Sequence, residues 1–152
     1  MYEGVDQSEV MIEYATDRMS AFAPRARVRR IEDGEPSRFG EGCDSESVDV
    51  VVSTYVLDIL SDDDIASMLT ESYRVLKKGG VLCLSGLTYG QDFRSKIVAT
   101  GWAFIHFLNP AIVGGCRAQE LSPYLGPGWT VREKVVVSGA KICSEVLVAV
   151  KN

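Results

Sequence analysis

The stretch from Ser47 to Gly86 reads SVDVVVSTYVLDILSDDDIASMLTESYRVLKKGGVLCLSG, and it decides the fold. Val48 and Val50–Val52 form a β-branched run without polar alternation, as expected of a parallel strand that is covered on both faces. A second such run occupies Val81–Leu84. The segment between the two runs has a helical pattern. We therefore predict a β-α-β unit, whose crossover should be right-handed.

The helix of this unit is marked by its two ends and by one apolar stripe. Ser61 is a good N-cap, Asp64 stands at the capping-box position, and Asp62–Asp64 put negative charge where the helix dipole favours it. Lys77–Lys78 are expected to close the last turn, with Gly79 as the left-handed residue after the helix. The positions that recur at helical spacing are expected to be buried: Ile65, Met68, Leu69, Ser72, Tyr73 and Leu76.

The same stretch resembles the middle of a class I S-adenosylmethionine-dependent methyltransferase. Asp49 opens a valine strand that ends in Ser53-Thr54-Tyr55, like the fourth strand of that family, and RVLKKGGVLCLSG resembles its "RxLKxGGxL" approach to the fifth strand. The resemblance implies an α/β fold, a Rossmann-like three-layer sandwich. Its sheet would be mostly parallel, with an antiparallel C-terminal hairpin.

The N-terminal string GVDQSEVMIEYA resembles the "GxDxSxxMLxxA" of the family's second strand and following helix. We expect a strand over Tyr2–Val5, and a helix from about Ser8 to Phe22. In the family, the acid at the strand end accepts hydrogen bonds from both ribose hydroxyls of the cofactor, which implies this role for Asp6 with Gln7 beside it. A carboxylate has two acceptor oxygens at the spacing of a vicinal diol. An ordinary turn aspartate is the alternative interpretation.

The next predicted strand, Arg27–Ile31, is followed by EDGEPSRF, where the family commonly has "GDAxxLPF". The resemblance implies that Asp33 reaches the adenine amino group and that the backbone N–H of Gly34 reaches a ring nitrogen. Glu32 replaces the usual glycine, so a register slip of one residue stays open. Ser53 and Thr54, at the end of the fourth-strand motif, complete the implied site for S-adenosylmethionine and its product S-adenosylhomocysteine.

The acceptor side of the implied site is less defined. A helix is expected over Gln91–Leu108, with a nearly continuous apolar run around His106, and it resembles the insertion that shapes the acceptor pocket in the family. His106 and Tyr55 are the candidates for removing a proton from the acceptor or orienting it. A packed or surface histidine and a core tyrosine are the alternatives. The apolar run hints at a partly apolar small-molecule acceptor.

The C-terminal third is predicted to begin with a short helix over Arg117–Leu125, whose Leu121 and Leu125 point inward. An antiparallel hairpin should follow, with strands Trp129–Val137 and Ile142–Val150. In its first strand the valines at 131, 135 and 137 are expected on one side. "SEVLVAVK" at the end is similar to the last strand of the family.

Bulk properties limit the function classes. The 152 residues suit one domain, residues 1–152, and a net charge of −5 argues against a nucleic-acid partner. Four scattered cysteines and one histidine make a zinc site or a disulfide scaffold improbable. The sequence shows no signal peptide and no long apolar span, so we expect no membrane span and a reduced, cytoplasmic location.

The resemblance starts at the family's second strand, so this domain is expected to be partial. The usual first strand and its glycine-rich "GxGxG" loop are absent from residues 1–152. We therefore expect an N-terminally truncated chain with either a gap in the sheet or a direct closure of the neighbouring strands. A homodimer could cover the missing strand, because free strand edges recruit partners.

Two functions stay open at this point. One is a methyltransferase with weak or no activity on its own, so whether the chain is an active enzyme is not decided. The other is a non-catalytic Rossmann-like remnant that acts as a binding or oligomerisation module. The absent glycine loop favours the second, and the retained Asp6 and Asp33 fit the first.

Overall fold

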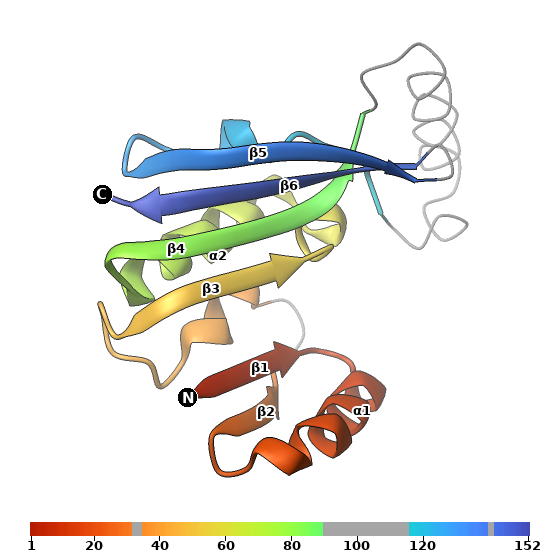
Figure 1. Cartoon of the computed structure of the whole chain (residues 1–152), viewed down its shortest axis with the longest axis vertical. Coiled ribbons are helices and arrows are strands. Elements are labelled where there is room, and N and C mark those ends of the chain that lie inside the picture. The colour runs from red at the N-terminus through yellow and green to blue at the C-terminus, as the bar shows by residue number, and fades with distance from the viewer. Residues whose placement is uncertain (32–34, 90–115, 140–141) are drawn as a thin grey trace.

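The computed structural model describes residues 1–31, 35–89, 116–139 and 142–152. Its elements follow one another along the chain as shown in Figure 1. They are β1 (Tyr2–Asp6), α1 (Glu9–Met19), η1 (Ser20–Phe22), β2 (Ala26–Arg30), η2 (Pro36–Gly40), β3 (Val48–Thr54), η3 (Leu57–Ile59), α2 (Asp62–Val75), β4 (Leu76–Thr88), η5 (Ser122–Tyr124), β5 (Trp129–Gly139) and β6 (Ile142–Lys151). None of the described helices is long and apolar enough to cross a membrane.

The strands form two sheets rather than one. β1 and β2 pair in parallel, and a four-stranded sheet has the order β3-β4-β6-β5. In the larger sheet β3 and β4 are parallel, whereas the β5–β6 hairpin is antiparallel, as the sequence predicted. Figure 1 shows β1 and β3 pointing the same way across a separation, and among the described strands neither pairs with the other. Of the two expected outcomes, the gap is the one observed.

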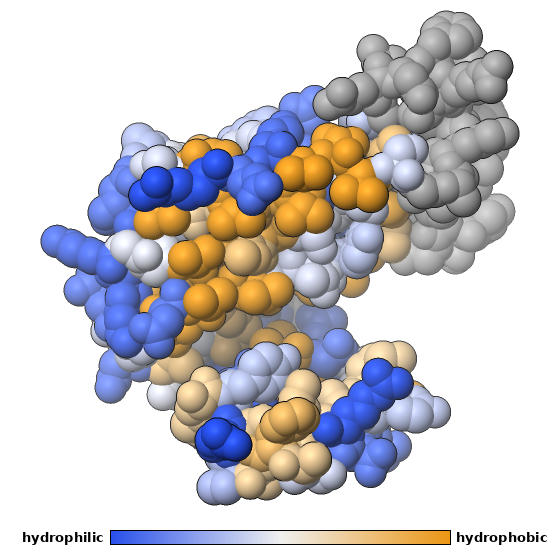
Figure 2. Space-filling view, in the orientation of Figure 1, coloured by the Kyte–Doolittle hydropathy of each residue, from blue (hydrophilic) through white to orange (hydrophobic). Residues whose placement is uncertain are grey.

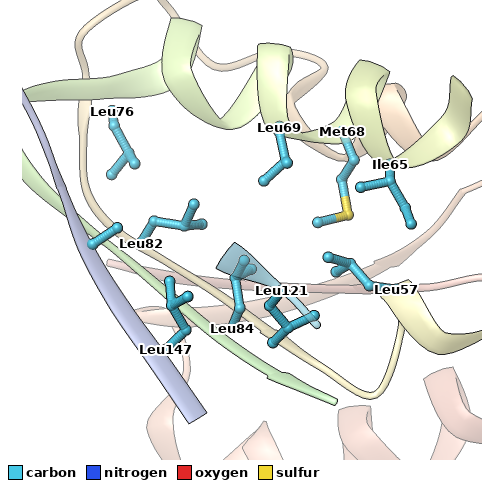
Figure 3. Packing of buried hydrophobic residues seen from close by; sticks show 10 residues of the cluster. Leu57, Ile65, Met68, Leu69, Leu76, Leu82, Leu84, Leu121 and Leu147 are labelled. Atoms are coloured by element: carbon cyan, nitrogen blue, oxygen red, sulfur yellow. The ribbon is translucent and has the colours of Figure 1, made fainter. Parts of the chain in front are cut away.

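The expected β-α-β unit of residues 47–86 is present, and its core is made of leucines. Side chains of α2 meet those of β4 and β6 between the helix and the sheet, and Figure 3 shows them pointing toward one another. The cluster consists of Leu57, Ile65, Met68, Leu69, Leu76, Leu82, Leu84, Leu121, Leu147 and Ala149. Each fully buried leucine contributes roughly 1.5–3 kcal/mol, so this cluster is the main source of stability in the described chain.

The N-terminus of α2 follows the prediction closely. The hydroxyl oxygen of Ser61 accepts the backbone N–H of Asp64 at 3.2 Å and donates to the carboxylate of Asp64 at 2.6 Å. This arrangement satisfies one of the N–H groups that a helix start leaves without an intrahelical partner.

The C-terminus of α2 differs from the prediction. The helix ends at Val75, and Leu76 is already extended, so Lys77 and Lys78 belong to β4 and not to the last helical turn. Gly79 does adopt a positive φ of 75°, but it does so inside an irregularity of β4, where the β3–β4 register shifts. Lys77 forms an ion pair with Asp49 of β3, with Nζ and Oδ1 at 2.7 Å.

One further prediction needs correction. The segment expected to be helical over Arg117–Leu125 contains only the short η5, although Leu121 is buried and Leu125 packs against the core as predicted. In α1, Met11 and Tyr14 are exposed, whereas Ile12, Ala15 and Met19 are half-buried and no residue is fully buried. The local sequence forms the helix, and α1 packs against β1 and β2 of the small sheet.

The sheet face opposite α2 is apolar and lacks a helical cover among the described residues. Strand alternation and the pairing register put the following residues on it: Val50, Val52, Thr54, Val81, Cys83, Ser85, Leu87, Thr130, Glu133, Val135, Val137, Ser144, Val146, Val148 and Val150. We call this set the valine face, and Glu133 is its only charged member. Figure 2 shows its hydrophobic surface over the four-stranded sheet. A bulge in β5 places Val131 on the other face, contrary to the expected set.

We predict that the Ser61→Ala variant loses about 1 kcal/mol of unfolding free energy, the usual cost of removing an N-cap hydroxyl. Urea unfolding followed by circular dichroism measures this loss. Ser8→Ala is the matched control, because Ser8 caps the exposed α1 through a longer contact of 3.4 Å to the N–H of Met11. An equal loss in both variants would mean that α2 is no more central to the fold than α1.

Candidate active site

The carboxyl ends of the parallel strands carry most of the residues that the sequence singled out. Asp6 ends β1 beside Arg30, which ends β2. Thr54 ends β3, whose carboxyl end points to the same side of the molecule as that of β1 (Figure 1). Figure 2 shows a hollow between the two parts of the chain that carry these strands. Open α/β sheets bind ligands at such an edge.

The loop after β1 is fixed by its own hydrogen bonds. One carboxylate oxygen of Asp6 accepts the backbone N–H of Ser8 at 2.8 Å, which orients the exposed side chain. The backbone oxygen of Gln7 accepts Nε of Arg30 at 3.0 Å. Since a carboxylate has about four acceptor positions, Asp6 keeps the capacity to bind a vicinal diol.

The end of β3 presents a buried polar atom. The Ser53 side chain is 9% exposed, and its hydroxyl oxygen has no hydrogen-bond partner among the described residues. Thr54, next to it, is exposed at the strand end. A buried hydroxyl is expected to find a partner, so Ser53 fits a site that takes a polar ligand.

Tyr55 has an unusual backbone conformation. Its φ is 57°, a left-handed value that is rare for a bulky residue. Its N–H donates to the backbone oxygen of Ser85 at 2.7 Å, and its phenol oxygen lies 3.0 Å from the hydroxyl oxygen of Ser144. Such outliers are concentrated at functional sites.

Three residues after Tyr55 comes a buried acid that the sequence did not single out. Asp58, in η3, is fully buried, and the N–H of Leu87 donates to both of its carboxylate oxygens at 3.1 and 2.9 Å. Burial raises the pKa of Asp58, while the Leu87 hydrogen bond partly offsets this effect. A Cβ on Gly86 would lie 2.5 Å from Asp58 Oδ1, so this position needs glycine. An acid inside the apolar run YVLDIL was the available signal.

The segment after residue 115 is held against this end of the sheet. The backbone N–H of Arg117 donates to the backbone oxygen of Asp58 at 2.9 Å, and its guanidinium donates to the carboxylate of Asp62 at 2.6 Å. That contact, together with the hydroxyl of Tyr124, lowers the pKa of Asp62. Gln119 donates to the backbone oxygen of Leu57 at 2.7 Å. Arg117 thus holds this segment in place through both contacts.

Three of the predicted site residues, Asp33, Gly34 and His106, lie outside the described residues. Of the others, Asp6 and Gln7 lie together after β1, and Ser53, Thr54 and Tyr55 lie together at the end of β3. The structure adds Ser144 to these residues. In the sequence it was only one polar position in an apolar strand.

Comparisons with known proteins give the family and the fold of the chain. A family model described as "Methyltransferase domain" matches residues 1–80, slightly more than half of the chain. A search of curated proteins found no match.

Solved structures match nearly the whole chain. Magnesium protoporphyrin IX methyltransferase from Synechocystis PCC 6803, with bound SAH, is 19% identical with a TM-score of 0.66, over 99% of this chain and 63% of that one. Geranyl diphosphate C-methyltransferase from Streptomyces coelicolor A3(2) is 14% identical with a TM-score of 0.66, over 99% and 62%. The YcgJ protein from Bacillus subtilis is 14% identical with a TM-score of 0.67, over 99% and 82%.

These matches show the fold, and the Rossmann-like class I methyltransferase architecture that the sequence predicted is confirmed. The chain spans less than two thirds of the length of the first two structures.

We predict that Asp58 stabilises the folded chain at acidic pH. Because its folded-state pKa lies above the ordinary value of 3.8, its contribution is fully present below that pH and is lost as pH rises through the folded-state value. The unfolding free energy of the parent chain, minus that of Asp58→Asn, should therefore decrease as pH rises toward neutrality. Urea unfolding across the pH range measures this difference.

Asp49→Asn is the control of opposite sign. The hydrogen bond from Lys77 lowers the pKa of the exposed Asp49, so its contribution is present above 3.8 and is lost as pH falls. If the two variants showed the same trend, burial would not be what sets the behaviour of Asp58.

Proposed function

We propose, from the premise that this chain belongs to the methyltransferase domain family, that it binds S-adenosylmethionine and transfers its methyl group to a small, partly apolar acceptor. One observation carries the proposal. Asp6 and the Ser53–Tyr55 segment end two parallel strands that point to the same side of the molecule (Figure 1). The matched methyltransferase structures support the cofactor, because two of them are described with bound SAH.

The residues are assigned by their chemistry. Asp6, with Gln7, offers an exposed carboxylate to the ribose hydroxyls, and Ser53 and Thr54 offer hydroxyls at the end of β3. Asp33 and Gly34 stay predictions for the adenine contacts. These groups would bind and orient the cofactor, which supplies an electrophilic methyl group.

The reaction needs positioning more than strong acid-base chemistry. A nucleophilic acceptor atom forms a bond to the methyl carbon while the carbon–sulfur bond breaks, and its electron pair returns to sulfur. The acceptor gives up its proton to water or to a nearby base. Tyr55 is our candidate for orienting the acceptor, and His106 stays a prediction for the same role.

The chain of residues 1–152 should bind the cofactor weakly and turn over slowly. It contains no GxGxG sequence to bring backbone N–H groups near the methionine portion. The separation of β1 from β3 also leaves the two halves of the proposed site on different sheets. We keep a reduced, cytoplasmic location as part of the proposal, and the free thiols of Cys43, Cys83 and Cys143 support it.

The second candidate function is a binding or oligomerisation module. The observation that favours it is the edge of β3 that pairs with no described strand, where Val50 is 50% exposed and Val52 is 64% exposed. An apolar strand with unpaired backbone groups recruits a partner strand. We propose that a second copy of the chain covers this edge, which would give a homodimer with or without catalysis.

Asp6→Ala tests the cofactor site. Hydrogen bonds to a charged group contribute roughly 1.5–3 kcal/mol, which corresponds to about a ten- to hundredfold loss in affinity for S-adenosylhomocysteine. Isothermal titration of parent and variant measures it. Asp17→Ala, an exposed acid on α1, is the matched control and should bind like the parent. An unchanged affinity in Asp6→Ala would remove Asp6 from the site.

Val52→Lys tests the dimer. A charge on the free edge of β3 should convert the dimer to a monomer in multi-angle light scattering, since strand edges with lysine resist pairing. Glu133→Lys, a charge change at the other side of the valine face, is the control. A parent chain that is monomeric at all concentrations would rule out this assembly. Methyl transfer measured on the same samples shows whether assembly and turnover are linked.

A further inference from the structure

The hydroxyl pair of Tyr55 and Ser144 joins two distant parts of the chain. Their oxygens are 3.0 Å apart, although β4 lies between β3 and β6 in the sheet. The phenol of Tyr55 must therefore reach across β4 over the valine face, to which Ser144 belongs by register. The left-handed φ of Tyr55 is the backbone conformation that accompanies this reach.

The surroundings of this pair are apolar. Ser144 lies directly opposite Leu87 of β4 and Val137 of β5, and Val146 follows it on the same face. Val137 and Val146 are exposed, and half of the Tyr55 side chain is accessible as well. Two hydroxyls thus stand at one end of an accessible hydrocarbon surface.

The hydrogen-bonding capacity of the pair is not exhausted. Each hydroxyl has one O–H to donate, and only one of the two is used between Tyr55 and Ser144. Whichever residue donates, one O–H and several lone pairs remain for a ligand that carries an oxygen atom. A single hydroxyl can rotate, so it does not fix the direction of its hydrogen bond to a ligand. The hydrogen bond between Tyr55 and Ser144 restricts this rotation.

The charge around the pair is neutral within the described part of the chain. Glu133, the one charge on the valine face, is opposite Val148 and so lies two rows of residues from Ser144. Lys134 extends to the other face, where its Nζ is 3.4 Å from Glu145. Arg117 is bound to Asp62 and to the backbone oxygen of Leu60. No described cation is placed to receive an anionic acceptor here.

We propose that Tyr55 and Ser144 form the subsite for the oxygen atom of a neutral, partly apolar acceptor, in which Ser144 acts as a positioning residue by holding the phenol of Tyr55. The proposal rests on the methyltransferase function above and specifies the class of its acceptor. Leu87, Val137 and Val146 contact the hydrocarbon part of the acceptor, and the hydroxyl pair orients its oxygen. No cation of the described residues faces this subsite, which disfavours carboxylate and phosphate acceptors.

The first readout does not depend on turnover. In the chain labelled with ¹³Cζ-tyrosine, the Tyr55 signal, assigned by its loss in Tyr55→Phe, should shift in Ser144→Ala and return in Ser144→Thr, which keeps a hydroxyl. Ser138→Ala, one position past Val137 and on the opposite face, is the control and should leave the signal in place. No shift in Ser144→Ala would show that Ser144 does not hold the phenol.

The second readout tests the acceptor class. Methyl 4-hydroxybenzoate and 4-hydroxybenzoate share one scaffold and differ in charge. With the chain saturated by S-adenosylhomocysteine, the neutral ester should bind and perturb the Tyr55 signal. Ser144→Ala should weaken that binding by roughly three- to tenfold, the scale of one neutral hydrogen bond. Ser144→Thr should restore it.

The outcomes separate the two proposals. If S-adenosylhomocysteine binds but the carboxylate binds better than the ester, or the ester leaves Tyr55 unperturbed, the acceptor subsite is wrong and the cofactor site stands. If S-adenosylhomocysteine does not bind at all, the methyltransferase function itself fails.

Discussion

The packing of α2 against β4 and β6 is the interaction on which the rest of the described structure depends. Leucines from all three elements fill one layer, in which Leu69, Leu82 and Leu84 are buried. This layer fixes β4, and β4 in turn carries β3 on one side and the hairpin on the other. Each residue of the candidate site beyond β1 is thus placed by its register on β4.

The sheet face opposite α2 and the outer edge of β3 contrast with that core. The valine face has the composition of a buried layer but is partly exposed among the described residues, and β3 has one unpaired edge. A small two-stranded sheet, whose helix α1 has no fully buried residue, is the other half of the site. The chain therefore combines a stable half with a half whose local stability should be low.

Local sequence signals predicted much of this. Residue-level patterns gave the β-α-β unit, the Ser61 cap and the hairpin, because strand alternation, capping and helix periodicity are local properties. The end of α2 was misplaced because Leu76 already pairs with Val48 of β3, so the strand begins before the Lys-Lys-Gly-Gly signal for a helix end. Tyr55 was found through its place after a strand, whereas Ser144 and Asp58 were missed, since their roles arise from contacts 89 and 29 residues away in sequence.

The central claim is that the ends of β1 and β3 form one cofactor site although they belong to separate sheets. Hydrogen–deuterium exchange with and without S-adenosylhomocysteine tests it most directly. The account predicts that the ligand slows exchange at residues 5–8 and at residues 53–57 together, with the same dependence on ligand concentration. Protection of only one of these segments, or of neither, would contradict it.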